Sequence, residues 1–268
     1  MSAALPSARD DATPPLLHIE GRQATIRLNR PAKLNRIEPA DLNTLAEHLG
    51  AIQRNKTLRV LVLTGTGRVF SAGYHLGDLD ERKAGRAQAP QTGATFAQVA
   101  DALADCRVPT LCALNGSVYG GSTDLALACD FRIGITGSQM LMPAGKLGVH
   151  YYLSGMQRYV TRLGLNSAKQ LFLLARPIDA NEMLRIGYLH QAVAKEDLAS
   201  TVAELAETLA GNAPLSLQNM KRALNQIAAN DVDMEAFNAG YEQCADSDDL
   251  AEGLAAWKER RAPEFKGR

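Results

Sequence analysis

The chain has 268 residues, of which 46% are hydrophobic, and its 29 basic and 29 acidic residues give a formal net charge of zero at pH 7. That apolar fraction is enough to bury the core of one large domain. The balanced charge gives no overall attraction to nucleic acid or to an anionic membrane surface, and no apolar stretch approaches the ~18 residues of a membrane span.

The cysteines and the start of the chain indicate the compartment. The first 15 residues, MSAALPSARDDATPP, lack the apolar segment of a signal peptide and predict a flexible tail over 1–15. The cysteines have no CxxC spacing, which is typical of a reduced, cytoplasmic protein. The histidines form no HxxxH or HExxH pair, so we expect no metal site.

The first half of the chain alternates predicted strands and helices. In chain order these are strands 16–19 and 24–28, helix 39–53, strand 59–64, helix 95–105, strand 110–114, a helix ending at 125–128 and strand 131–135. The polar segment 80–94, between strand 59–64 and helix 95–105, is predicted to be a mobile loop. Such alternation favours an α/β fold with largely parallel strands.

The second half is predicted to be mostly helical from about residue 155. Its helices are expected at 167–174, 180–187, 198–210, 214–228, 234–246 and 249–260, with one short strand at 190–194. We therefore divide the chain into a core over 16–200 and a helical C-terminal region over 201–268. The amphipathic helices of that region must bury a face, and we expect a neighbouring subunit to cover it.

A glycine-rich turn follows the predicted strand 59–64, in the sequence LTGTGRVFSAGY (63–74). Small residues let a ligand approach the backbone, although a plain tight turn has the same composition. Gly65 and Gly67 give a GxG pattern, but no third glycine and helix follow in the register of a dinucleotide site.

A second glycine-rich segment, NGSVYGGSTDL (115–125), follows a predicted strand and opens a helix. The N–H groups at a helix start attract negative charge, so Asp124 in the first turn either stabilises the helix dipole or takes part in chemistry. Backbone N–H groups from two such turns can converge on one oxygen, which is the architecture of an oxyanion hole. A thioester enolate is the charge that such a site would suit.

Several motifs in order resemble those of one family. FSAG (70–73) resembles the F-[SA]-A-G motif of the crotonase (enoyl-CoA hydratase/isomerase) superfamily, and 115–125 resembles its N-G-x-x-x-G-G-x-x-[ED]-L motif. The segments 29–35, 177–187 and 252–265 resemble the family's N-R-P-x-x-x-N segment, its later helix pair and its C-terminal end. The resemblance covers about residues 16–266.

This resemblance implies a fold, a substrate class and an assembly. The fold would be an α/β, crotonase-like spiral of ββα units with a C-terminal helical extension. The substrate would be an acyl-CoA, with coenzyme A as part of the substrate and no permanently bound cofactor. The protein would form a homotrimer or a dimer of trimers through 201–268, with neither nucleic acid nor membrane as a partner.

The resemblance also implies roles for single residues. The backbone N–H groups of Tyr74 and Gly121 would form the oxyanion hole, and Asp124 would be the acid/base. The residues expected to hold the nucleotide end of CoA, the last two of them on either the same or an adjacent subunit, are Ala32, Leu34, Ala72, Lys258 and Phe265.

The sequence departs from the family at a position that matters for hydration. Hydratases of this family use two glutamates, which align with Asp124 and Ala144 here. Adding water to a double bond needs a base for the water and a proton source for the neighbouring carbon, and alanine supplies neither. An ordinary hydratase mechanism is therefore in question, whereas an isomerase-like proton shuttle needs a single acid/base.

The segment LGVHYYL (147–153) resembles the methylmalonyl-CoA decarboxylase branch, with Tyr151 in the place of that branch's active-site tyrosine. Decarboxylation needs no base to remove a carbon-bound proton. His150, Tyr151 or His75 could orient the leaving carboxylate, although each has a purely structural alternative as a surface or packing residue.

Three hypotheses follow. The first is an acyl-CoA-processing lyase or isomerase of the hydratase/isomerase family that stabilises a thioester enolate. The second is a decarboxylase or lyase acting on a carboxylated acyl-CoA. The third is a weakly catalytic acyl-CoA-binding protein or an RNA-binding structural relative, and the zero net charge disfavours RNA.

Overall fold

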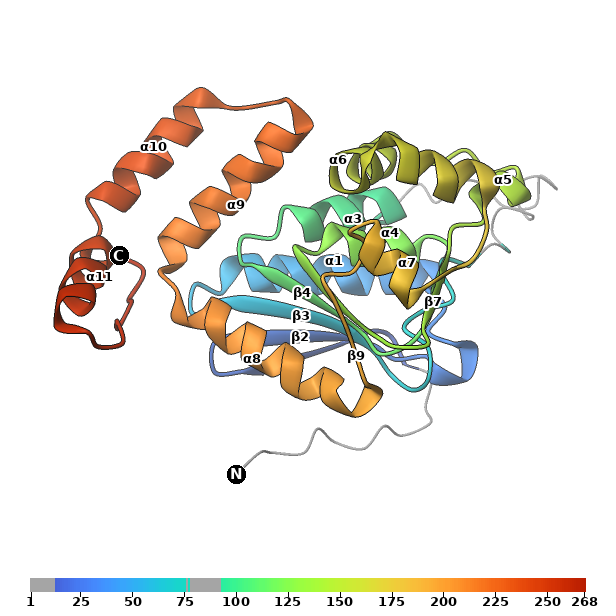
Figure 1. The fold of residues 1–268 in the computed structure, drawn as a ribbon, viewed down its shortest axis with the longest axis horizontal. Helices are drawn as coiled ribbons and strands as arrows, with labels where there is room; N and C mark the ends of the chain where they lie inside the picture. The colour runs from blue at the N-terminus through green and yellow to red at the C-terminus, as the bar shows by residue number, and fades with distance from the viewer. Residues whose placement is uncertain (1–12, 76, 78–92) are drawn as a thin grey trace.

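The computed structural model describes residues 13–75, 77 and 93–268 (Figure 1). Most of the predicted tail over 1–15 and of the predicted loop over 80–94 lies outside the described residues. No described helix is both long and apolar enough to span a membrane.

A six-stranded sheet in the order β1-β2-β3-β4-β6-β9 forms the centre of the described structure. β1 and β2 are an antiparallel hairpin, and every other neighbouring pair is parallel. The strands are β1 (Leu16–Glu20), β2 (Gln23–Leu28), β3 (Val60–Gly65), β4 (Thr110–Leu114), β6 (Phe131–Ile135) and β9 (Gln191–Val193). The predicted hairpin and the predicted parallel α/β arrangement are confirmed.

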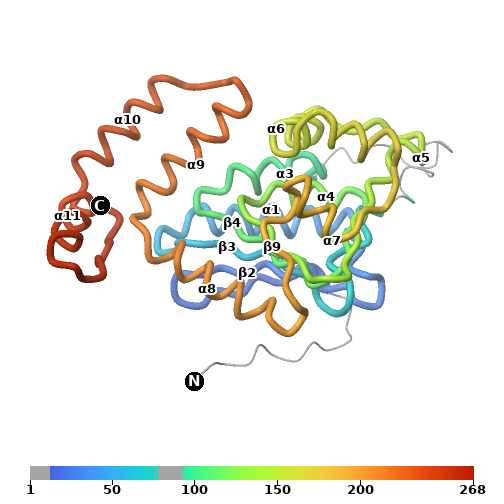
Figure 2. The backbone as a smooth tube through the Cα atoms, in the orientation of Figure 1, coloured from blue at the N-terminus to red at the C-terminus, as the bar shows by residue number. Residues whose placement is uncertain are grey.

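Helices cover both faces of this sheet, so its central strands are buried at every position. Successive side chains of β3 point to opposite faces of the sheet. Leu61 and Leu63 pack in one apolar core, and Val60 and Val62 pack in the other. The first core lies under α1 (Pro39–Arg54), α3 (Phe96–Ala104) and α4 (Ser122–Ala128), and the second lies under α8 (Leu198–Gly211) (Figures 1 and 2).

A second, small sheet and several short helices lie outside the main sheet. The sheet has the order β5-β7-β8 and was not predicted, because strands of two or three residues leave no periodic pattern. These elements are η1 (Pro31–Lys33), β5 (Val118–Tyr119), β7 (Gln139–Leu141), α5 (Ala144–Leu147), β8 (Ile178–Asp179), α7 (Ala180–Arg185) and η3 (Lys195–Asp197).

The prediction of a helix over 167–174 is wrong about where the helix begins. α6 (Leu153–Lys169) begins much earlier and continues into the π-helix η2 (Gln170–Leu174). Gly164 interrupts α6 with φ +80°, and Leu153 at its start is an exposed apolar side chain. The apolar positions Tyr159 and Leu163 lie one turn apart on its buried face, so the start of this helix could have been read from the sequence.

The C-terminal helices leave the sheet after α8. The predicted core boundary at 200 falls inside α8, which packs on β3, β4 and β6. α9 (Pro214–Ala229), α10 (Met234–Ala245) and α11 (Asp248–Glu259) then extend away from one end of the sheet (Figures 1 and 2). They pack mainly on one another, α9 on α10 and α10 on α11.

Candidate active site

Two glycine-containing segments lie side by side just beyond the carboxyl ends of β3 and β4. The Phe70 N–H donates to the Ser117 carbonyl at 3.1 Å, and the Tyr119 N–H donates to the Ser71 carbonyl at 3.0 Å. The buried Ser71 hydroxyl also hydrogen-bonds the Ser122 hydroxyl at 2.7 Å, at the first residue of α4. In parallel sheets, ligands bind at this carboxyl edge.

Close contact between the two turns requires glycine. Gly73 has φ +95°, and a Cβ there would lie 2.8 Å from the Tyr119 carbonyl oxygen and 3.3 Å from the Gly120 Cα. The predicted oxyanion residues, Tyr74 and Gly121, directly follow these abutting glycines, so the structure brings them together. The Gly121 N–H belongs to the start of α4, where N–H groups have no acceptor inside the helix.

A row of aromatic rings borders this pair of turns. A Cβ on Gly121 would lie 2.9 Å from Cζ of Phe96, so the Phe96 ring covers this residue. The Phe96 ring centroid lies 5.8 Å from that of Tyr74 and 6.3 Å from that of Tyr152. Tyr152 in turn stacks on Tyr151, with ring centroids 4.4 Å apart. Such rings offer an apolar wall with hydroxyl groups at defined points.

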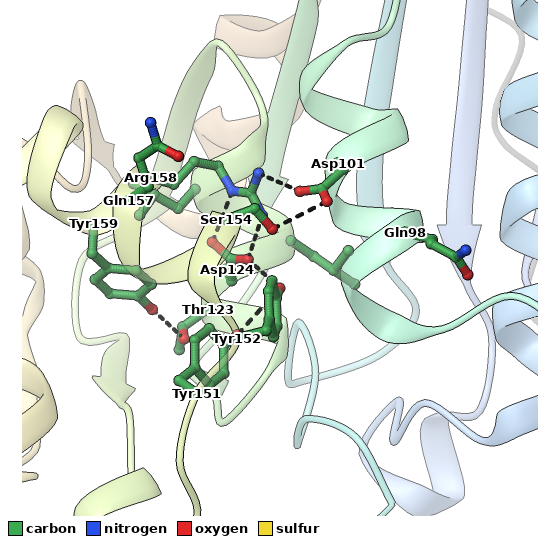
Figure 3. Close-up of polar contacts among 12 residues, drawn as sticks. Gln98, Asp101, Thr123, Asp124, Tyr151, Tyr152, Ser154, Gln157, Arg158 and Tyr159 are labelled. Carbon is green, nitrogen blue, oxygen red and sulfur yellow. Dashed lines mark hydrogen bonds and ion pairs between the residues drawn. The ribbon is translucent and has the colours of Figure 1, made fainter. Parts of the chain in front are cut away.

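Asp124 is completely buried and lies between an arginine and a tyrosine of the α6 region (Figure 3). Arg158 binds both carboxylate oxygens, with Nε 3.1 Å from Oδ1 and Nη2 2.8 Å from Oδ2. The Tyr152 hydroxyl donates a short hydrogen bond to Oδ2. A two-point pair of this kind is among the stronger polar contacts in proteins.

Arg158 also links α4 to α3. Its Nη1 lies 2.9 Å from Oδ1 of Asp101, and the Ser154 hydroxyl donates to Oδ2 of Asp101 at 3.1 Å (Figure 3). Burial opposes the charge of Arg158, but the hydrogen bond and the charge of Asp124 raise its pKa overall. Burial and the Asp124 charge also raise the pKa of Tyr152, so its hydroxyl is a neutral donor.

The sequence analysis missed Tyr152, Arg158 and Asp101. Arg158 follows Asp124 by 34 positions and Asp101 by 57, as their hydrogen bonds record, and no spacing pattern joins such distant residues. The start of α6 at Leu153 is the signal that could have placed them, because Tyr152 is the residue before that helix.

Of the other residues predicted to act on the acyl group, Tyr151 contacts Tyr152 at the site, whereas no contact with Asp124 or Tyr152 is found for His150 or His75 among the described residues. Tyr151 adjoins the site, with its hydroxyl 3.5 Å from that of Tyr152. His150 is exposed, and its Nδ1 lies 2.9 Å from the Tyr151 carbonyl. His75 lies two residues after Gly73, with Nδ1 3.6 Å from Oε2 of Glu38. Ala144 is 7% exposed and begins α5.

The predicted CoA-binding residues form two groups. Leu34 and Ala72 are adjacent, because the Ala72 N–H donates to the Leu34 carbonyl at 2.8 Å, and Ala32 lies in η1 beside them. Lys258 and Phe265 are elsewhere. The carbonyl next to Phe265 accepts from Arg59, which directly precedes β3, whereas Ala72 lies beyond the other end of that strand.

A six-residue strand spans roughly 20 Å, so one subunit does not bring Lys258 and Phe265 to the other three residues. Of the two arrangements expected for Lys258 and Phe265, contact from an adjacent subunit is therefore the one that stays a prediction. The physical reason is that α9–α11 carry the chain away from the carboxyl edge of the sheet (Figure 1).

A cavity of about 1020 Å³ lies at the opposite, amino edge of the sheet, between Arg107, Arg59 and residues of α9. Its lining includes none of Tyr74, Gly121 and Asp124, so the glycine turns and not this cavity define the candidate site. Within residues 13–75, 77 and 93–268, no cluster of His, Cys, Asp and Glu could hold a metal ion.

Comparison with known proteins decides the family. Residues 19–268 match the sequence profile described as "Enoyl-CoA hydratase/isomerase". The chain belongs to the enoyl-CoA hydratase/isomerase family. Its crotonase-like α/β fold is thereby confirmed, because a crystal structure of an enoyl-CoA hydratase from Bacillus anthracis superimposes with a TM-score of 0.84 at 27% identity, over 96% of this chain and 100% of that one.

Relatives within the family have different activities. A short-chain-enoyl-CoA hydratase from Clostridium acetobutylicum is 30% identical over 94% of this chain and 98% of its own length. A 1,2-epoxyphenylacetyl-CoA isomerase from Escherichia coli is 32% identical over the same shares, 94% and 98%. Membership of the family thus identifies the protein as an acyl-CoA-processing enzyme. It does not determine which reaction the enzyme catalyses, because relatives of similar identity are named for different reactions.

Proposed function

We propose that this enzyme binds an acyl-CoA and stabilises the enolate of its thioester between the N–H groups of Tyr74 and Gly121. The observation that carries the proposal is the contact of Gly73 with Tyr119 and Gly120, which supports a position of the Tyr74 backbone close to Gly121 at the start of α4. One such donor contributes roughly 3–4 kcal/mol to the stability of a developing oxyanion. The names of both relatives above contain CoA esters, which supports the substrate class.

We further propose that the reaction is an isomerase-type proton shuttle. Asp124 is a buried carboxylate beside the proposed oxyanion hole. Ala144 offers no acid or base at the position that the family resemblance aligns with the second glutamate of hydratases. Moving a double bond requires removal of one carbon-bound proton and its return to another carbon. A single acid/base system can do both in turn.

The same proposal places the nucleotide end of CoA beside Ala32, Leu34 and Ala72. The backbones of Leu34 and Ala72 are already paired there, next to the two turns. Lys258 and Phe265 would reach this position from a neighbouring subunit of a trimer or a dimer of trimers, since their own subunit holds them at the other edge of the sheet.

Decarboxylation of a carboxylated acyl-CoA is the second candidate. It is favoured by Tyr151, whose ring stacks on Tyr152 and whose hydroxyl faces the Tyr152 hydroxyl. A carboxylate leaving as carbon dioxide would generate the same enolate with no base. The proposed oxyanion hole would serve both reactions.

Three substrates separate these candidates. Crotonyl-CoA tests hydration through the loss of enoyl thioester absorbance, a 3-enoyl-CoA tests isomerisation through its gain, and malonyl-CoA tests decarboxylation. We expect turnover of the 3-enoyl-CoA, reduced at least about 100-fold in Asp124→Ala, as for loss of an acid/base system. Turnover of malonyl-CoA alone would favour the second candidate, and unchanged turnover in Asp124→Ala would refute the role of Asp124.

A further inference from the structure

We propose that the Tyr152 hydroxyl, and not the Asp124 carboxylate itself, exchanges protons with the bound acyl group. Asp124 would then act through Tyr152, as the acceptor and store of the tyrosine proton. This inference rests on the proposed enolate function and names the group that does its proton transfer.

Asp124 itself is poorly placed to meet a substrate. It is 0% exposed, and Arg158 donates hydrogen bonds to both of its carboxylate oxygens. The Tyr152 hydroxyl donates a further hydrogen bond to Oδ2. A substrate carbon could approach the carboxylate only by displacing a two-point ion pair inside the protein. Breaking such a buried pair typically costs about 3–5 kcal/mol.

Tyr152 does have access to the proposed acyl site. Its side chain is only partly buried, and its ring lies against Phe96, the same ring that covers Gly121. The hydroxyl thus bonds the buried carboxylate, while the ring that carries it belongs to the aromatic border of the oxyanion turns. Figure 3 shows this hydroxyl directed at Asp124, with Arg158 on the far side of the carboxylate.

The position of Tyr152 is fixed by the fold. It is the residue before α6, with extended backbone at φ −75° and ψ 153°, so its side chain is anchored by the helix that carries Arg158. Stacking on Tyr151 holds the ring from the other face. Both partners of Asp124 therefore come from one rigid element.

The proton transfer balances without a co-reactant. A carbon–hydrogen bond of the acyl group breaks, and its proton moves to the Tyr152 oxygen as the tyrosine proton moves to Oδ2 of Asp124. The electron pair of that bond stays on the thioester as the enolate. In the return step, Asp124 gives its proton back to Tyr152 as Tyr152 protonates a carbon, and Arg158 remains protonated throughout.

The test uses butyryl-CoA, a saturated thioester that reports α-proton removal by exchange with deuterated water, followed by NMR. In Tyr152→Phe we expect exchange to fall at least about 100-fold, while the affinity for butyryl-CoA, measured by calorimetry, changes less than about threefold. Tyr159→Phe is the matched control, because its hydroxyl bonds Thr123, the neighbour of Asp124, at 2.6 Å. It should exchange at close to the wild-type rate.

The outcomes distinguish this inference from the proposed function. Wild-type exchange that persists in Tyr152→Phe but is lost in Asp124→Asn would overturn the role of Tyr152 and leave the enolate function standing. Wild-type binding without any exchange would overturn both. If Tyr152→Phe does not fold, 3-fluorotyrosine at position 152 keeps the hydroxyl but makes it more acidic. An unchanged exchange rate in that protein would overturn the inference.

Discussion

Arg158 and Asp124 form a two-point ion pair in the interior, with an arginine side chain 11% exposed and a carboxylate fully buried. We expect Arg158→Met to lower the free energy of unfolding by about 3–5 kcal/mol, because it leaves a buried charge without its partner. Urea denaturation measures this loss. The double variant Arg158→Met/Asp124→Asn should recover part of it, and a double variant as unstable as the sum of the single ones would contradict the pairing.

Gly73 should tolerate no side chain. Gly73→Ala adds a methyl 2.8 Å from the Tyr119 carbonyl at φ +95°. Gly137 also has positive φ, +81°, but open space around its Cβ position, so Gly137→Ala carries the backbone strain alone, about 1–3 kcal/mol. Thermal unfolding should show a clearly larger loss for Gly73→Ala, accompanied by loss of acyl-CoA binding. Equal losses would mean that the contact between the turns is unimportant.

The Phe96 ring should limit the size of the side chain that residue 121 can carry. Gly121→Ala places a methyl 2.9 Å from the Phe96 ring, which must move. We expect at least about a tenfold fall in kcat/KM, since a shifted ring disturbs one oxyanion donor. Adding Phe96→Leu should restore part of the activity by making room. A double variant that is no better than Gly121→Ala would contradict this explanation.

His190 should make the fold less stable in acid. Burial, followed by the charges of Arg132 and Arg162, lowers the pKa of His190 from 6.5 to about 4. The unfolded chain therefore takes up a proton near pH 6.5 that the folded chain refuses until about pH 4, so stability is lost as pH falls through this window.

Unfolding takes up less than about one proton at His190 between these pH values. The loss of stability is correspondingly modest, because the imidazole is partly in contact with solvent, which weakens the shift of its pKa. Denaturation curves at pH 7 and pH 5 measure the effect. His190→Gln should show a smaller loss between the two pH values than the wild type. An equal loss in both proteins would contradict the assignment to His190.

The C-terminal helices should mediate self-association. Trp257 and Leu254 on α11 are 87% and 65% exposed, and nothing in the described part of the subunit covers them. Sedimentation should show an oligomer for the wild type and a shift toward monomer for Trp257→Gln/Leu254→Gln with an unchanged circular dichroism spectrum. A wild-type monomer would contradict the predicted trimer contact and, with it, the proposed contribution of Lys258.

The sequence predicted the parts of this protein that depend on local pattern. The hairpin, the buried strands β3 and β4 and helix α1 follow from periodicity. The roles of Tyr74 and Gly121 come only from the family resemblance of the two glycine motifs, and they stay a prediction. The hydrogen-bond partners of Asp124 could not be predicted, because Arg158 meets Asp124 only through the packing of α6 on α4. The position of Lys258 likewise depends on where α9–α11 leave the sheet.

The most direct test of the central claim is a titration with acetoacetyl-CoA, whose enolate has its own ultraviolet absorption band. A site that stabilises a thioester enolate lowers the apparent pKa of this ligand, by at least about one unit for 1.4 kcal/mol of preference. We predict that the enolate band grows on binding to the wild type at neutral pH, and that it grows far less with Gly73→Ala. Binding proved by calorimetry with no change in the enolate band would contradict the claim that Tyr74 and Gly121 stabilise an enolate.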